Sequence, residues 1–371
     1  MNSTVVHYLS QFQFFHQLLA MMGKEYLPLL SLIIFLLVVL IMLGALSLVG
    51  GLGTYAERKI SADMQARYGP NRVGPFGLLQ FLADGIKMFL KEDTVPRSAD
   101  RLIFTIAPIF CLAGVFGTIA VLPFSSGFML TDLNVGIFYL LGVSSLVGIG
   151  VFLGGYASNS KWSMLGGMRG ASQIISYEIP VTITILAVVM LAGGLSLQTL
   201  VNSQGAAIWH WNFLHNPFMF VGFFIFFIGA LAETNRAPFD LPEAESELVS
   251  GYHTEYSGMR FAFFALAEYI EIFVVCAVAT ALFLGGYHVP FGFGGEAPLG
   301  QVLQVVTFAS KTFALYYVVI WVRWTLPRLR VDQLMTLCWK YLTPIALFNL
   351  IGTIIWLYLT NGRSIVALIF G

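Results

Sequence analysis

The chain has 371 residues, of which 58% are hydrophobic and only 10% are charged, and its 19 basic residues balance 19 acidic ones. Its mean hydropathy of +0.82 excludes a water-soluble globular domain of this length. The composition therefore predicts an integral membrane protein.

Eight apolar runs of about 20 residues follow one another along the chain. A helix of that length crosses the roughly 30 Å of hydrocarbon in a bilayer and satisfies its own backbone hydrogen bonds there. We therefore expect an all-α membrane protein with about eight transmembrane helices. The runs lie at 27–55, 101–122, 135–155, 172–194, 216–233, 261–285, 302–322 and 342–360.

Lys and Arg are distributed unevenly between the loops. The loops near 123–134, 195–215 and 286–301 contain neither residue, whereas the alternate loops are basic. Basic loops stay in the cytoplasm, which places both termini outside it. The expected cytoplasmic loops are about 57–101, 156–171, 234–260 and 323–341. Residues 27–360 would form one membrane domain, with an extracytoplasmic extension at 1–26 and a tail at 361–371.

The segment LLQFLADGIKMFLKED, which follows the first span, is amphipathic at helical spacing. Leu82, Ile86 and Phe89 share one side, and Asp84 and Lys87 lie on the other. About 15 residues with charges are too short for a span, so we expect a helix in the plane of the membrane surface. It would anchor the chain, or wall a cavity that a lipid-soluble substrate enters from the bilayer.

The segment from Glu233 to Tyr256 is polar and strongly acidic, and it separates two apolar runs. Only Arg236 and Arg260 lie in or beside it as bases. A row of acids beside a membrane is typical of a proton or cation route, of a docking surface, or of both. The acids of the loop are Asp240, Glu243, Glu245, Glu247 and Glu255.

Carboxylates also lie inside or at the edge of apolar runs. An ionised, unpaired Glu178 would cost about 3 kcal/mol on insertion scales, so it either exchanges protons or is a neutral acid in a helix interface. Glu233 either takes part in proton transfer or pairs with Arg236. Glu268 and Glu271 share one helix face, so at least one of them should be protonated or paired.

Lys311 is the one cation within the seventh apolar run. It is either a proton-conducting lysine or is held by a counter-ion such as Glu268 or Glu271. The cysteines occur singly and the histidines lack metal-ligand spacing, so no metal site is expected.

Five sequence blocks, in order along the chain, resemble a known family. They are YAERK, RYGPNRVGPFGLLQ, ASNSKWSMLGGMRGASQIISYE, AETNRAPFDLPEAESELVSGYHTEYSG and AEY. Together they resemble the H-subunit family of proton-pumping NADH:quinone oxidoreductase (respiratory complex I), whose mitochondrial counterpart is subunit 1. The resemblance covers roughly residues 27 to 360.

The resemblance implies a bacterial inner-membrane subunit of this enzyme, with no redox centre of its own. It would form the entrance and membrane-side wall of the quinone chamber and couple quinone reduction to proton translocation. Quinone would be the substrate at that shared chamber, with FMN and iron–sulfur clusters in partner subunits. The implied partners are hydrophilic quinone-site and iron–sulfur subunits on the cytoplasmic side, membrane pumping subunits laterally, and lipid, but not nucleic acid.

Two groups of residues carry this expectation. The family's entrance region matches Glu57, Arg58, Arg67 and Asp84. Its acidic chain matches Asp240, Glu243, Glu245, Glu247, Glu255, Glu178, Glu233 and Glu268, and Glu271 would titrate as well or share a proton with Glu268. By position, the aromatic residues expected to touch the quinone ring are Tyr68, Phe76, Phe239 and Tyr269.

Two other functions remain open from the residues. One is the membrane subunit of a related energy-converting hydrogenase, whose members resemble this chain less in the RYGPNRVGPFG and PFDLPEAE blocks. The other is a free-standing ion transporter, which usually shows paired discontinuous helices in two repeated halves. No such repeat is visible in the sequence.

Overall fold

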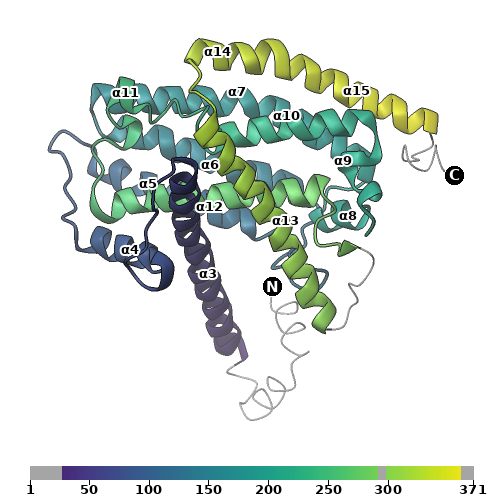
Figure 1. Ribbon diagram of the computed structural model, residues 1–371, viewed down its shortest axis with the longest axis horizontal. Helices are drawn as coiled ribbons and strands as arrows, with labels where there is room; N and C mark the ends of the chain where they lie inside the picture. Colours follow the sequence, from purple (N-terminus) through teal and green to yellow (C-terminus); the bar gives the residue numbers. More distant parts are fainter. Residues whose placement is uncertain (1–26, 291–297, 361–371) are drawn as a thin grey trace. The chain divides into compact units, whose positions relative to one another are not determined.

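The computed structural model describes residues 27–290 and 298–360, and every regular segment among them is helical (Figure 1). The expected extension at 1–26 and tail at 361–371 lie outside the described residues. Two compact units, 1–49 and 50–371, make up the chain. Helix α3 (Leu27–Met64) begins in the first unit and ends in the second. The all-α prediction is confirmed.

Seven helical segments of the described chain are long and apolar enough to cross a membrane. An eighth apolar helix, α10 (Pro217–Glu233), has only 17 residues. Asn216 caps its start through a 2.5 Å bond from the Met219 N–H to Oδ1, and Pro217 occupies its first turn. All eight expected runs thus fall on helices. The seven are Val39–Met64 of α3, α5 (Arg101–Ile119), α6 (Gly136–Ala157), α7 (Lys161–Ala192), α12 (Gly258–Phe283), Leu299–Thr325 of α13 (Pro298–Thr325), and Val331–Thr360. The last comprises α14 (Val331–Thr336), the π-turn η6 (Leu337–Leu342) and α15 (Thr343–Thr360).

Helix α7 begins earlier than its apolar run. Its first turns, from Lys161, occupy much of the segment expected to be the loop 156–171. Hydrophobicity marks only the part of a helix that lies in hydrocarbon, and the polar first turns are helical as well. Glu178 is therefore in the middle of a 32-residue helix and not near its start.

The amphipathic helix after the first span is α4 (Gln80–Leu90), with 11 residues. It is shorter than expected because the chain before it forms the 3₁₀ turn η2 (Pro75–Gly77), where Phe76 and Gly77 have φ of 54° and 80°. Its apolar residues Ile86, Phe89 and Leu90 are all exposed. Such an uncovered apolar stripe is what a helix at a membrane surface presents.

Glycines allow α5, α6 and α7 to pack with their backbones close together. Gly150 of α6 lies against Ala107 and Cys111 of α5, and Gly155 lies against the Ser163 carbonyl of α7. Small residues serve this purpose in membranes because close van der Waals packing, and not the hydrophobic effect, holds helices together there.

Helix α12 is the most enclosed of the long helices. It contacts α5, α10 and α13, and its far end meets α8 (Leu197–Asn202) and α9 (Asn212–His215). Helix α15 lies across α7 and α10 (Figure 1). Acidic residues on α12 are therefore forced into the interior of the protein.

Lys311 of α13 holds the end of α12. Its Nζ donates to the carbonyls of Leu284, Gly286 and His288 at 2.9, 3.0 and 3.1 Å and lies 4.3 Å from the centre of a Trp211 ring. A cation suits the negative end of a helix dipole. The alternative in which Glu268 or Glu271 is its counter-ion is wrong, because backbone carbonyls accept from all three of its protons.

Substituting Gly155 by Ala should destabilise the contact between α6 and α7. The new Cβ would lie 2.5 Å from the Ser163 carbonyl oxygen and 2.9 Å from the Gly167 Cα, and overpacking of this kind costs about 1–3 kcal/mol. Thermal unfolding of the detergent-solubilised protein should show a lowered midpoint. The matched control is Gly142→Ala on the same helix, where a Cβ meets nothing within 4 Å. Equal midpoints for the two variants would contradict this account.

Candidate functional site

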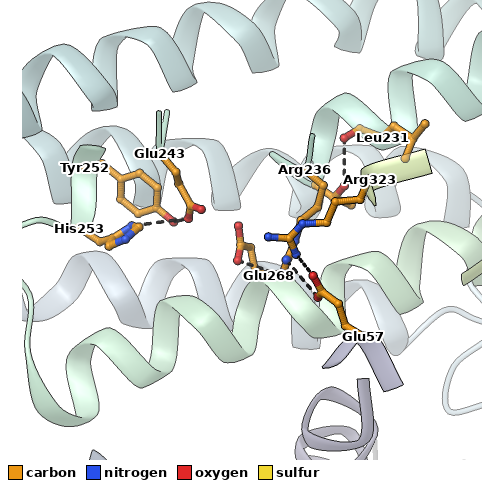
Figure 2. A network of polar contacts seen from close by, with 9 residues as sticks. Glu57, Leu231, Arg236, Glu243, Tyr252, His253, Glu268 and Arg323 are labelled. Atoms are coloured by element: carbon orange, nitrogen blue, oxygen red, sulfur yellow. Dashed lines mark hydrogen bonds and ion pairs between the residues drawn. The ribbon is translucent and has the colours of Figure 1, made fainter. Parts of the chain in front are cut away.

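Arg236 lies at the centre of a buried ionic network (Figure 2). Its side chain is 4% exposed; Nη1 lies 3.3 Å from Glu57 Oε2, and Nη2 lies 3.1 Å from Glu268 Oε2. The guanidinium is also 4.3 Å from the centre of the Tyr269 ring. The network thus joins α3, α12 and the loop that follows α10.

Gln173 of α7 fixes the loop that carries Arg236. Its buried amide nitrogen donates to the Ala232 carbonyl at 3.0 Å, to Asn235 Oδ1 at 3.1 Å and to the Phe239 carbonyl at 2.8 Å. Asn235 has a φ of 49°, a left-handed conformation that Asn tolerates well. This turn directs the next side chain, Arg236, into the protein.

Glu57 is 6% exposed and accepts from a second arginine, Arg323 of α13. Two cations therefore face two carboxylates, which is the condition under which charges tolerate burial. Burial by itself would lower the pKa of Arg236, but the carboxylates of Glu268 and Glu57 outweigh it and raise that pKa well above its usual value. Arg236 is thus a permanent buried cation.

Glu243 adjoins this network on the side of the acidic loop. Glu268 lies between Glu243 and Arg236 (Figure 2). Burial and the neighbouring Asp240 raise the pKa of Glu243 to about 7, although Arg236 acts in the opposite direction. The carboxyl group of Glu243 is therefore a weaker acid than an ordinary glutamate.

A cavity of about 70 Å³ lies between α6, α7 and α10, and two carboxylates line it. These are Glu178 and Glu233, with Ser144, Tyr177 and Thr182 among the other lining residues. A cavity of this size with polar groups on its wall has room for water. The structure therefore brings together two acids that lie far apart in the sequence.

Glu271 lies three residues after Glu268 on α12 and is a further buried carboxylate. It is 5% exposed and interacts electrostatically with Glu233 and with Glu268, while Glu233 interacts with Glu178. The carboxylates Glu243, Glu268, Glu271, Glu233 and Glu178 hence form one electrostatically continuous set, which we call the acidic series.

The remaining acids of the loop have other partners. Asp240 is paired with Arg328 at 2.7 Å, and the exposed Glu247 with Arg169 at 2.5 Å. Glu255 forms no ion pair with another described residue, and the side chain of Glu245 lies outside what the structure describes. The alternative that Glu233 pairs with Arg236 is wrong, because Arg236 turns to Glu57 and Glu268.

The residues expected at a quinone entrance divide into a buried and an exposed group. Glu57 and Tyr269 belong to the buried network, and Phe239, within the loop, is 4% exposed. Arg58 binds Asp84 at 2.6 Å and so joins α3 to α4. The exposed residues are Arg58, Arg67, Tyr68 and Phe76. Tyr68 lines an open hollow of about 410 Å³ with the segment up to Arg72 and with Gln80.

Sequence reasoning misses the partners that come from distant helices. The sequence pattern places Arg323 and Arg328 only in a basic loop at 323–341, yet they bind Glu57 and Asp240. An arginine at the end of an apolar run is the available signal for Arg323. Gln173 is missed as well, although an amide in an apolar run needs partners.

Fold and site together define a polytopic α-helical membrane protein whose interior holds a series of ionisable carboxylates around a buried arginine. A family model described as NADH dehydrogenase matches residues 34–354. The chain belongs to this family.

Curated relatives agree with that assignment. The H subunit of NADH-quinone oxidoreductase from Anaeromyxobacter dehalogenans is 48% identical over 335 residues, which are 86% of this chain and 81% of the relative. The corresponding protein of Chlorobaculum parvum is 50% identical over 311 residues, 82% of this chain and 87% of the relative. That of Geobacillus thermodenitrificans is 51% identical over 317 residues, 84% and 92% of the two chains.

Replacing Arg236 by Met should destabilise the protein strongly. Glu57 would keep Arg323, but Glu268 would lose its one ion-pair partner among the described residues, and breaking a buried pair costs about 3–5 kcal/mol. The yield of folded protein and its thermal midpoint in detergent should both fall. Arg67→Met removes an exposed arginine and serves as the control. Similar midpoints for the two variants would show that the network does not stabilise the fold.

Proposed function

We propose that this chain is the membrane subunit of a proton-translocating NADH:quinone oxidoreductase. It forms the entrance and the membrane-side wall of the quinone chamber and couples quinone reduction to proton translocation. The observation that carries the proposal is the acidic series, which runs from Glu243 in the loop to Glu178 between α6, α7 and α10.

The names of the relatives indicate which enzyme the chain belongs to. They are subunits of a complex that, by its name, passes electrons between NADH and quinone. For this chain we infer the same complex, with FMN and iron–sulfur clusters in hydrophilic partners and pumping subunits beside it in the membrane. The basic loops, α4 and the acidic loop would face the cytoplasm, and both termini the other side of a bacterial inner membrane.

The exposed face of α4 suits the entry of a lipid-soluble quinone. Ile86, Phe89 and Leu90 present apolar surface, and the pair Arg58–Asp84 fixes α4 to the end of α3 that carries Glu57. A quinone that slides along α4 would reach the hollow beside Tyr68 and the loop segment above the buried network.

Reduction of the quinone changes the charge next to the acidic series, and the protonation of the carboxylates responds to that change. Reduction by two electrons creates negative charge on the quinone oxygens, which is neutralised when two protons bind to form the quinol. A carboxylic acid at Glu243 that gives up a proton becomes an anion beside Glu268. That new charge then favours proton movement along the buried carboxylates toward Glu178.

Glu271→Gln should interrupt the series where it joins the network to the cavity. The amide has nearly the same shape but cannot exchange a proton, so quinone reductase turnover and proton uptake into sealed vesicles should fall by about tenfold or more. Asp332→Asn, an exposed acid in the first turn of α14, is the matched control. Wild-type turnover and pumping in the Glu271 variant would exclude the proposed coupling role.

The pH dependence of turnover should follow the protonation state of Glu243. With a pKa of about 7, this group is protonated below pH 7 and ionised above it. If the protonated acid is the working form, the turnover that depends on it falls as pH rises through about 7. Glu243→Gln should abolish this transition and lower turnover mainly below pH 7. A transition that persists in the variant would assign it to another group.

A further inference from the structure

His253 adjoins the acidic series without belonging to it. It lies at the end of the 3₁₀ turn η4 (Gly251–His253), in the loop that carries Glu243. Its Nδ1 is 3.5 Å from Glu243 Oε1, and its side chain is 15% exposed. The side chain of Glu243 is 23% exposed, so the imidazole and the carboxylate lie side by side at the edge of the network (Figure 2).

Two aromatic rings hold the imidazole in place. The Tyr252 ring lies 5.0 Å away at an interplanar angle of 87°, and the Phe261 ring lies 5.2 Å away at 63°. Edge-to-face packing of this kind restricts ring orientation. Tyr252 also directs its hydroxyl to the same oxygen, Glu243 Oε1, at 3.5 Å. The two neighbouring residues thus converge on one carboxylate oxygen.

We propose that His253 is the proton-exchange partner of Glu243 and connects the acidic series to water at the loop. This inference rests on the function proposed above, and it adds a positioning and proton-relay residue that acts through Glu243. At 3.5 Å a small closure brings the two atoms into hydrogen-bond range, and such contacts are often long before substrate binds.

The proton transfer balances without a further reactant. When Glu243 has lost its proton, the Nδ1–H bond of a protonated His253 breaks and a bond to Oε1 forms. The neutral imidazole then takes a proton from water at the surface. An imidazole suits this exchange because its usual pKa of about 6.5 is close to neutrality.

Several other charged or titratable groups surround His253 and Glu243. Asp240 and Arg236 act on Glu243 with opposite signs, and Glu268 interacts with both Glu243 and His253. Helices α7 and α6 pack against η4, and Arg169 of α7 is paired with Glu247. On α5, Cys111 interacts with Tyr252. The carboxylates Glu243 and Glu268 are thus the partners that a protonated His253 faces.

The consequence is a second access for protons to the acidic series. A proton that Glu243 has lost would be replaced through His253, from water at the cytoplasmic surface. The quinone does not replace it, because it takes up protons when it is reduced. Turnover at alkaline pH, where fewer protons are available in water, would then depend on His253 more strongly than turnover at acidic pH.

The test uses the whole complex in its own membranes. Quinone reductase activity is measured from about pH 6 to about pH 9 for His253→Gln and His253→Phe, and is normalised to ferricyanide reduction by NADH. Phe retains a ring to pack against Tyr252 and Phe261 but carries no exchangeable proton. His210→Gln, at an exposed histidine in the turn η3 (Ile208–His210), is the matched control.

We expect both His253 variants to retain turnover near pH 6 and to lose about tenfold near pH 8, with His210→Gln unchanged. A pH profile like that of the wild type, or a uniform loss that Phe restores, would overturn the relay and leave only a packing role. Glu243→Gln separates the two claims. If it is impaired while both His253 variants behave like the wild type, only this inference fails. If it too behaves like the wild type, the proposed function fails as well.

Discussion

The burial of Arg236 is the constraint on which the rest of the site depends. A guanidinium that is 4% exposed requires carboxylates within reach, and Glu57 and Glu268 supply them from α3 and α12. Gln173 holds the loop that delivers the arginine. Glu268 is fixed in turn by this pair, and it lies between Arg236 and Glu243 (Figure 2). The buried arginine thus determines where the loop acid and the α12 acids meet.

The length of the apolar runs was enough to predict the membrane-spanning helices, because a segment in hydrocarbon must be both apolar and helical. It could not predict where polar helix turns begin, as the early start of α7 at Lys161 shows. Ion pairing was the least predictable feature. Arg236 lies three positions after Glu233 in the sequence, but the turn at Asn235 sends it to Glu57 instead. Pairing is decided by tertiary packing, which local sequence does not encode.

Two cations hold α12 at different points. Arg236 pairs with Glu268 in the first half of the helix, and Lys311 donates to three carbonyls just beyond its end. Glu271 lies between them as a buried acid that forms no ion pair of its own with another described residue. We therefore propose that its protonation state is the one that responds when charge changes at Glu243 or Glu233.

The central claim is that quinone reduction changes the protonation of the acidic series. The most direct measurement is the infrared difference spectrum of the complex between its oxidised and quinol-loaded states, in the region of protonated carboxyl stretching. The account predicts a change in this region that is lost or altered in Glu271→Gln. An unaltered difference band in that variant would contradict it.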